Sequence, residues 1–359
     1  MKPIRHAAGS LLVVGLGGTE LTGLERAWLR LVRPSGIILF RRNIVDAKQT
    51  RTLLNEAASY CNKASLRCVD VEGGTVDRLR DSVAPMPSAQ AVAATNKPSL
   101  MHKHGALIAK ETRAFGFNTT LAPVLDLALP ISAGVMGTRV TTTDPEGVIR
   151  YARAFLAGLS ANGIVGCGKH FPGLGGGTLD SHQETPAIER GWNALWKHDL
   201  APYRDLIAEL PMVMVNHAAY PQTRGGKTPA SASTFWITTI LQKRIGYKGL
   251  IFSDDMEMGG ILKFLPIEEA ALASIHAGMH MLEICHSPEL ILRCYEALVH
   301  EAEHSQAFER LLLARAREAD RLRTKLIKPV KPALSDTRLV KLRDEVLRFS
   351  AHTTAGQPG

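Results

Sequence analysis

The sequence predicts an α/β fold, a single-domain (β/α)8 TIM-like barrel. Eight short runs rich in apolar and β-branched residues alternate with longer amphipathic segments along the 359 residues. This alternation is typical of parallel strands joined by helices, and eight repeats of it are what such a barrel requires. Polar side chains follow several of the strand candidates, which is where barrel enzymes carry their active sites.

Each strand candidate is a short apolar run bounded by glycine, proline or polar residues, as expected of a strand buried on both faces. The eight candidates cover residues 11–16, 36–40, 66–71, 117–127, 163–171, 212–220, 249–256 and 277–285.

The helix candidates lie between these runs and show apolar residues at helical spacing. Several of them end at glycine, which helix C-termini favour because glycine adopts positive φ without strain. They cover residues 21–32, 46–61, 98–116, 144–163, 235–246 and 267–278.

Composition places the chain among globular proteins, since 45% of its residues are hydrophobic and 21% are charged. Its five cysteines are odd in number and form no C-x-x-C pair, so neither a disulfide framework nor a zinc knuckle is predicted. Reduced thiols fit this pattern best, and we expect a cytoplasmic protein.

The net charge of +9 raises nucleic acid and membrane surfaces as partners. The chain has no basic stripe interleaved with aromatic residues, so we expect no nucleic-acid partner. It has no run of about 20 apolar residues, so no membrane span is predicted. The apolar run 11–16 follows a basic N-terminus, as in a secretory signal, but it leads straight into a helix pattern and is interpreted as a strand. The excess charge favours an anionic substrate.

Polar residues cluster at the ends of five strand candidates. A single carboxylate there is commonplace because turns and helix caps use it, so ordinary caps and loop hydrogen bonds are the alternative interpretation. Convergence of five strand ends on one rim favours a functional site. The residues are Asp70, Glu72, Asp126, Lys169, His170, Asn216, His217, Asp254 and Asp255.

Successive motifs of the chain resemble those of glycoside hydrolase family 3. They are VDVEGGTVDRLR (69–80), LAPVLDL (121–127), GKHFPGLGGGTLDSHQETP (168–186), VNHAAYP (215–221) and IFSDDMEM (251–258). The likeness is closest to the single-domain bacterial β-N-acetylhexosaminidases of this family, which take part in peptidoglycan recycling. It ends before the last part of the chain. We therefore expect residues 1–326 to form the catalytic domain and residues 327–359 to form a C-terminal tail that is partly helical or disordered.

The resemblance implies a retaining glycosidase that releases terminal β-linked N-acetylglucosamine from muropeptides or related glycans through a covalent glycosyl-enzyme intermediate. It implies that Asp254 is the nucleophile and that His182 is the general acid and base, oriented by Asp180. An imidazole suits both proton transfers because its unperturbed pKa, about 6.5, lies near the working pH. The glycine-rich stretch 173–177 precedes His182, so we expect a mobile loop that closes over the sugar.

The resemblance also implies that five residues surround the terminal N-acetylglucosamine. The acidic one would accept hydrogen bonds from sugar hydroxyls, and the basic ones would donate to hydroxyl or acetamide oxygens, as a ring rich in hydroxyls demands. A surface ion pair or a hydrogen bond at the barrel rim is the alternative role for each of them. The five are Asp70, Arg78, Arg139, Lys169 and His170.

Two positions depart from the family pattern. Leu174 stands where relatives commonly carry a third histidine, and Thr75 replaces a residue that is often basic. Catalysis should survive because the implied acid and base is His182. Loop packing, and contacts beyond the terminal sugar, are expected to differ.

Two alternative functions remain open. A phosphorylase or transglycosylase would pass the glycosyl unit to phosphate or another acceptor, and a neutral histidine repels an incoming anion less than a carboxylate does. A non-catalytic sugar-binding barrel would not need both Asp254 and the pair of Asp180 and His182. A metal held by His170, Asp180 and His182 is disfavoured, because their spacing is irregular and the loop is flexible. We expect no metal or cofactor, and a monomer.

Overall fold

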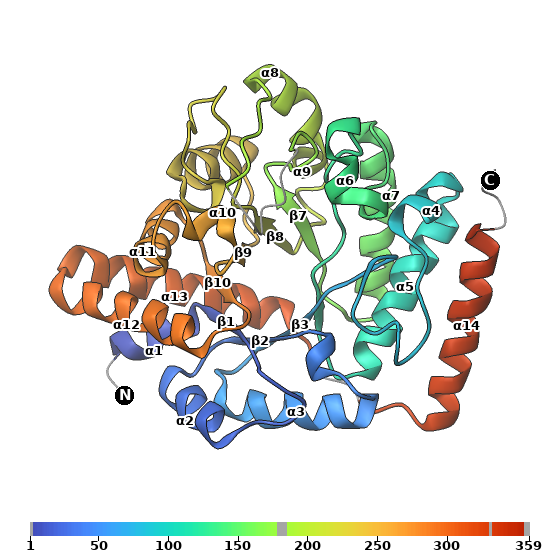
Figure 1. The fold of residues 1–359 in the computed structure, drawn as a ribbon, viewed down its shortest axis with the longest axis horizontal. Helices are drawn as coiled ribbons and strands as arrows, with labels where there is room; N and C mark the ends of the chain where they lie inside the picture. The colour runs from blue at the N-terminus through green and yellow to red at the C-terminus, as the bar shows by residue number, and fades with distance from the viewer. Residues whose placement is uncertain (1–2, 178–184, 330–331, 355–359) are drawn as a thin grey trace.

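A computed structural model describes residues 3–177, 185–329 and 332–354 and shows eight parallel strands in one barrel, with helices around it (Figure 1). The predicted (β/α)8 barrel is confirmed, and every strand candidate contains a strand. The strands are β1 (Leu12–Gly15), β2 (Gly36–Leu39), β3 (Leu66–Val69), β6 (Thr119–Thr120), β7 (Cys167–Phe171), β8 (Met212–Val215), β9 (Leu250–Asp255) and β10 (Met281–Ile284).

The sheet closes on itself to make the barrel. Its strand order is β6-β3-β2-β1-β10-β9-β8-β7, which leaves β6 and β7 at the two edges. Thr119 in β6 forms a parallel bridge to Val165, just before β7, and the backbone N–H of Leu125 donates to the carbonyl of Lys169 at 2.6 Å. Consecutive strands are therefore neighbours all the way around, and their carboxyl ends meet at one rim.

All six predicted helical segments are helical, although Phe235–Ile245 winds as a π-helix. The predicted segments contain α2 (Gly23–Val32), α3 (Ala47–Tyr60), α5 (Pro98–Ala114), α7 (Pro145–Ala161), η6 (Phe235–Ile245) and α11 (Ile267–Ala277). The other α-helices of the described residues are α1 (Pro3–Ser10), α4 (Ala89–Ala94), α6 (Ala133–Met136), α8 (Trp192–Ala194), α9 (Ala201–Asp205), α10 (Gly259–Leu262), α12 (Pro288–His304), α13 (Gln306–Leu326) and α14 (Asp336–Thr354).

Local side chains explain where several helices begin and end. Helix α2 starts at a capping box, in which the Thr22 hydroxyl accepts from the Glu25 N–H at 3.1 Å and the Glu25 carboxylate accepts from the Thr22 N–H at 2.7 Å. The Asp144 carboxylate caps α7 in a similar way. Gly246 and Gly278, with φ of 87° and 115°, end η6 and α11 in the left-handed conformation that glycine tolerates.

The strand-end loops add short elements that position the site. After β3, the chain forms a hairpin of β4 (Val71–Gly73) and β5 (Val76–Asp77), with the exposed Thr75 in its turn. The 3-10 helix η1 (Arg41–Asn43) follows β2, and η3 (Gly137–Arg139) follows β6 at some distance along the chain. These segments bring Glu72, Arg139 and the arginines of η1 to the rim of the barrel.

The last helix lies against the outside of the barrel. In Figure 1, α14 runs beside α5, and residues of α14 contact both α5 and α4. Leu342, Val346 and Phe349 of α14 are buried there, and Glu345 pairs with Lys110 of α5 at 2.8 Å. The N-terminal helix α1, which no sequence pattern indicated, packs against α12 and α13.

The cysteines are reduced, as their number and spacing in the sequence predict. All five cysteines are unpaired thiols, and burial raises the pKa of Cys61 and Cys294 to about 12 each, so these thiols stay protonated. Within the described part of the chain, no helix has the length and apolar character needed to cross a membrane.

Candidate active site

A cavity of about 440 Å³ opens at the carboxyl ends of the barrel strands. Its volume lies within the range of about 300–1,000 Å³ that is common for small-molecule sites. Its lining comes from β2, β7, β8, β9 and β10 and from the segments that follow β2, β3, β6, β7, β9 and β10. Six residues to which the sequence gave a catalytic or sugar-binding role line this cavity: Asp70, Arg78, Arg139, Lys169, His170 and Asp254.

Lys169 lies at the centre of the charged floor of the cavity. Its ammonium nitrogen is 2.9 Å from Asp70 Oδ1 and 2.6 Å from Glu72 Oε1, and the Lys169 side chain is 4% exposed. Burial alone would lower the pKa of Lys169, but attraction from Asp70 and Glu72 raises it above its ordinary value. The lysine is therefore a fixed positive charge between two carboxylates, which leaves it no role as a proton donor near neutral pH.

Glu72 joins Lys169 to Arg139. The Arg139 guanidinium grips both oxygens of Glu72, with Nε–Oε2 at 2.8 Å and Nη2–Oε1 at 2.9 Å. Burial would raise the pKa of Glu72, but Arg139 and Lys169 lower it well below its usual range. A planar two-point contact of this kind fixes orientation as well as charge.

His170 extends this network of charged side chains, because it contacts both Arg139 and Asp126. Asp126 Oδ2 lies 2.6 Å from His170 Nδ1, and Arg139 Nη2 lies 3.3 Å from His170 Nε2. The second Asp126 oxygen accepts the backbone N–H of Leu174 at 2.7 Å, so one carboxylate holds both the imidazole and the start of the following loop. The peptide bond between Lys169 and His170 is cis, and both side chains line the cavity.

Asp254 is the last residue but one of β9 and is half-buried, and it lines the cavity. Its Oδ1 accepts the backbone N–H of Asp255 at 3.0 Å. Burial alone would raise the pKa of Asp254. Attraction from His170, His217 and Lys169 outweighs burial and lowers that pKa below its ordinary value. Asp254 is therefore an ionised carboxylate, partly stripped of water and accessible to a small molecule in the cavity.

Asp255, the next residue, has the opposite character. Burial, and then repulsion from Glu257, raises its pKa to about 7. Its backbone carbonyl lies 3.0 Å from His217 Nε2, and the other ring nitrogen of His217 is 2.7 Å from the Ser231 hydroxyl. The two neighbouring carboxyls thus titrate in different pH ranges, because the groups around Asp254 outweigh its burial and those around Asp255 do not.

One wall of the cavity is aromatic and cationic. The rings of Phe40 and His286 stack with centroids 5.2 Å apart, and the Arg42 guanidinium lies 4.8 Å from the centre of the Phe40 ring. Arg42 Nη2 also donates to the carbonyl of Cys285 at 2.6 Å. Arg78 approaches the same ring at 5.8 Å while pairing with Asp70 at 3.7 Å. This wall therefore presents aromatic rings on which a ligand could stack, together with two arginine charges.

A group of metal-ligating side chains in the described residues lies at this wall. Suitable atoms of Asp255, Glu257 and His286 lie within 4.8 Å of one another. Arg42 Nη1 is 2.8 Å from His286 Nδ1, and because arginine only donates, Nδ1 accepts and the ring proton sits on Nε2. That nitrogen faces Asp255 at 3.8 Å. The arrangement is a hydrogen-bonded wall, and its histidine has no lone pair directed at a metal.

Two of the predicted catalytic residues, Asp180 and His182, lie outside the described residues. The described chain on either side is anchored close to the cavity. Leu174 lines the cavity and packs against the apolar cluster of Val124, Met136 and Val140, which explains how leucine is accommodated at this position. Beyond the gap, the Thr185 hydroxyl donates to the carbonyl of Gly260 at 2.7 Å, just after β9.

Sequence reasoning gave no specific role to several residues of the site, among them Glu72 and Glu283, which line the cavity, and Asp126, which holds His170. Glu72 and Asp126 were recognised only as strand-end carboxylates, and their partners could not be known before the fold was known. Glu283 in β10 was missed because it sits in an apolar run, MLEI. A single acidic residue inside a buried strand was the signal that could have found it.

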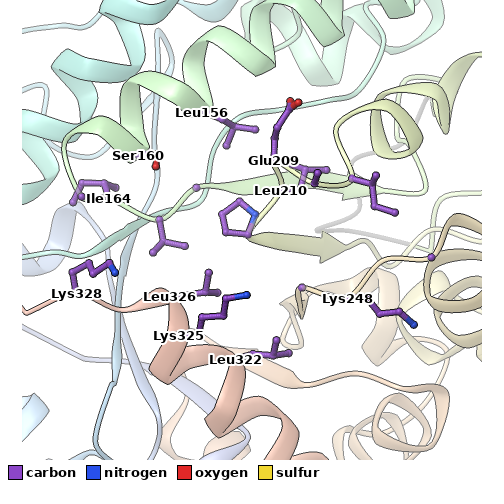
Figure 2. A pocket seen from close by; sticks show the side chains of 18 residues that line it. Leu156, Ser160, Ile164, Glu209, Leu210, Lys248, Leu322, Lys325, Leu326 and Lys328 are labelled. Atoms are coloured by element: carbon purple, nitrogen blue, oxygen red, sulfur yellow. The ribbon is translucent and has the colours of Figure 1, made fainter.

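A second cavity, of about 640 Å³, lies at the opposite end of the barrel (Figure 2). It is lined by residues that precede β7, β8 and β9 and by the end of α13, with Leu210 and Leu322 among its apolar side chains and three lysines around it. Among its lining residues the one acid is Glu209, which pairs with Arg153. Its lining therefore holds no pair of facing carboxyl groups such as glycosidases use.

Comparison with known proteins agrees with the geometry. Residues 6–317 match the Glycosyl hydrolase family 3 N terminal domain. A beta-hexosaminidase of Alkalilimnicola ehrlichii is 37% identical over 287 residues, which are 78% of this chain and 82% of that protein. A beta-hexosaminidase of Glaesserella parasuis is 33% identical over 310 residues, or 86% of this chain and 90% of that protein.

A similar solved structure is NagZ from Neisseria gonorrhoeae in complex with N-trifluoroacetyl-D-glucosamine. It is 30% identical, superimposes with a TM-score of 0.72, and the match covers 86% of this chain and 98% of that one. The family 3 beta-N-acetylglucosaminidase of Paenibacillus is 28% identical with a TM-score of 0.86, over 96% of this chain and 68% of that chain.

Proposed function

Because the chain belongs to glycosyl hydrolase family 3 and is a glycosidase, we propose that it is a retaining β-N-acetylhexosaminidase. The proposed reaction is hydrolysis of terminal β-linked N-acetylglucosamine from muropeptides or related glycans. The names of its relatives support the sugar. The observation that carries the proposal is Asp254, an ionised carboxylate at a strand end, open to a cavity of suitable size.

Asp254 is proposed as the nucleophile. Its carboxylate attacks the anomeric carbon, the bond from that carbon to the leaving oxygen breaks, and an ester forms between the sugar and Asp254. Water then attacks the same carbon from the other side and frees the carboxylate, so the anomeric configuration is retained. The low pKa of Asp254 supports this role, because the group must be ionised before the first step.

His182 is proposed as the general acid and base, oriented by Asp180. In the first step His182 gives its proton to the leaving oxygen, and in the second it takes a proton from water. The anchor at Thr185 supports this assignment, because Thr185 is tied to Gly260, just beyond the strand that carries Asp254. His182 is three residues earlier, and three residues span at most about 11 Å.

The charged floor is proposed to bind the terminal sugar. Asp70 is fixed by Lys169 and Arg78, and its remaining lone pairs are available to accept from sugar hydroxyls. Arg139 is gripped by Glu72, so it offers the sugar only the donors that Glu72 and His170 leave unused. The network is thus formed in advance, and binding requires little rearrangement of charge.

The sugar preference is tested with chromogenic substrates. The protein should hydrolyse 4-nitrophenyl β-N-acetylglucosaminide with a kcat/KM at least about 100-fold above that for 4-nitrophenyl β-glucoside. A roughly equal rate on the two substrates would contradict an N-acetylhexosaminidase. Release of N-acetylglucosamine from purified muropeptides, compared with release from chitin fragments, then identifies the preferred aglycone.

Product analysis separates hydrolysis from phosphorolysis. The hydrolase releases free N-acetylglucosamine whether or not phosphate is present, whereas a phosphorylase makes the sugar phosphate only when phosphate is added. We propose hydrolysis, by a monomeric cytoplasmic enzyme that needs no cofactor and binds neither nucleic acid nor membrane. Sedimentation of the purified protein measures the oligomeric state.

We further propose that residues 1–326 are the catalytic domain and that residues 327–359 are accessory to it. The cavity supports this division, because all of its lining residues precede residue 287. The packing of α14 on α5 supports a role for the tail in stability, and none of its described residues lines the cavity.

A further inference from the structure

Glu283 is a buried acid on the inner wall of the barrel. It belongs to β10, between β1 and β9, and it lines the same cavity as Asp254 and Lys169. The residue is 2% exposed, and its Oε1 has no hydrogen-bond partner in the described part of the chain. Its neighbours along the strand, Leu282 and Ile284, are apolar and fully buried.

The charges around Glu283 do not stabilise an ionised carboxylate. Burial first, then repulsion from Asp70, Asp255 and Asp254, raises the pKa of Glu283 well above its usual range. Lys169 is the cation that opposes this effect, and its ammonium is already engaged at 2.9 Å by Asp70 and at 2.6 Å by Glu72. These surroundings therefore favour the neutral carboxylic acid form of Glu283.

A buried polar atom without a partner costs about 1–3 kcal/mol, so packing alone does not account for Glu283. Leucine would fill a similar volume in this strand without that cost. A neutral carboxylic acid offers one O–H donor and one carbonyl acceptor side by side. A hydroxyl group, which both donates and accepts, is the complementary partner, and the cavity beside Glu283 is where the proposed sugar binds.

We propose that Glu283 is a specificity-determining residue, which holds one hydroxyl of the terminal sugar by donating a hydrogen bond to it and accepting another from it. The inference rests on the proposed function, since it needs a sugar in the cavity. It gives the strand a role in choosing among sugars that differ at a single hydroxyl, because a site built to pair with a hydroxyl rejects an analogue that lacks it.

The test compares kcat/KM on 4-nitrophenyl β-N-acetylglucosaminide and on its 3-, 4- and 6-deoxy analogues. The wild type should lose at least about tenfold on one of these analogues. Glu283→Leu should lose at least about tenfold on the parent substrate, and its penalty for that one analogue should shrink to less than about threefold. Glu283→Gln, which keeps a donor and an acceptor in the same volume, should recover most of the loss.

Met281→Leu is the matched control, because Met281 lies two residues away on the same strand, is fully buried and does not line the cavity. It should leave all four values within about twofold. Thermal unfolding should show Glu283→Leu to be at least as stable as the wild type, since it removes an unpaired polar atom. If that variant does not fold, Glu283→Ala is used in the same comparison.

Two results would overturn the inference. One is a Glu283→Leu variant whose parent activity and three deoxy penalties all equal those of the wild type. The other is a Glu283→Gln variant as impaired as Glu283→Leu, which would mean that the ionised form is needed. Failure of the proposed function looks different, because the wild type itself would then not hydrolyse the parent substrate. In that case, calorimetric titration of wild type and Glu283→Leu with N-acetylglucosamine still tests the contact.

Discussion

Lys169 Nζ lies 2.6 Å from Glu72 Oε1, with both side chains almost fully buried at 4% and 2% exposure. Removing one partner of such a pair leaves the other charge buried without compensation, which typically costs about 3–5 kcal/mol. The pair also holds Asp70 and Arg139 in place from either side. The rim of the barrel therefore combines local stability with a rigid array of charges.

Glu72→Gln is expected to lower both stability and activity. It removes the charge that Arg139 and Lys169 share, so the melting temperature should fall by several degrees, and kcat/KM should fall at least about tenfold, mainly through KM. Thermal unfolding and steady-state kinetics measure these changes. Glu56→Gln is the matched control, since Glu56 pairs with Arg26 at 2.7 Å but on the surface. Surface pairs contribute about 0–1 kcal/mol, so equal losses in the two variants would contradict the assignment.

His182→Ala should slow hydrolysis according to how much the leaving group needs a proton. A 4-nitrophenolate leaves without protonation, so the first step on that substrate should suffer least, whereas a sugar or an alkyl aglycone should suffer about 100-fold more. Kinetics over a series of aryl and alkyl β-N-acetylglucosaminides measure this difference. If activated and natural substrates lost rate by the same factor, His182 would not be the acid.

Asp255→Asn is expected to change how stability depends on pH. The pKa of Asp255 is raised to about 7 in the folded protein, from 3.8 in an unfolded chain. Between these values the unfolded chain has released a proton that the folded protein keeps, so folding stability falls as pH rises from about 4 to about 7. Asparagine does not titrate, so the stability of the variant lacks this decrease with rising pH. Its melting temperature relative to the wild type should therefore be about 2–4 °C more favourable at pH 8 than at pH 5.

Calorimetry at the two pH values checks this effect. The side chain of Asp255 is 17% exposed, so solvent screens it little and the shift should be measurable. A melting-temperature difference that stays constant between pH 5 and pH 8 would show that Asp255 is ionised in the folded protein at both values.

Phe349→Ala tests the assigned role of the C-terminal helix. Phe349 is 2% exposed, and its ring lies 5.9 Å from the ring of His104 in α5. Truncation of a buried phenylalanine typically costs about 3–5 kcal/mol, so the melting temperature should fall while kcat/KM stays within about twofold. Leu347→Ala, at a residue that is 45% exposed, is the control and should change neither. A large loss of activity in Phe349→Ala with no loss of stability would contradict an accessory role for α14.

The strands and the main helices could be predicted because their signals are local. A four-residue apolar run such as that of β8 needs only its own composition to be recognised, and Gly278 marks the end of α11 by its conformational freedom. Helix α1 could not be recognised in this way. It is a short helix that is stabilised by contacts with α12 and α13, which are remote in the sequence.

The site was predictable to the extent that it follows strand ends. Lys169 and Asp254 stand at the carboxyl ends of their strands, so the barrel alone brings them together. The bidentate grip of Arg139 on Glu72 joins residues 67 positions apart, and no spacing rule anticipates it. Glu283 was hidden for a different reason, because its surroundings in the sequence are those of an ordinary core strand.

The most direct test of the account is to trap the glycosyl-enzyme intermediate. A 5-fluoro derivative of N-acetylglucosaminyl fluoride slows both steps but has a good leaving group, so the ester should accumulate on the enzyme. Mass spectrometry of the digested protein should find one sugar adduct, on the peptide that contains Asp254, and Asp254→Asn should carry none. An adduct on another residue, or a product of inverted anomeric configuration, would contradict Asp254 as the nucleophile.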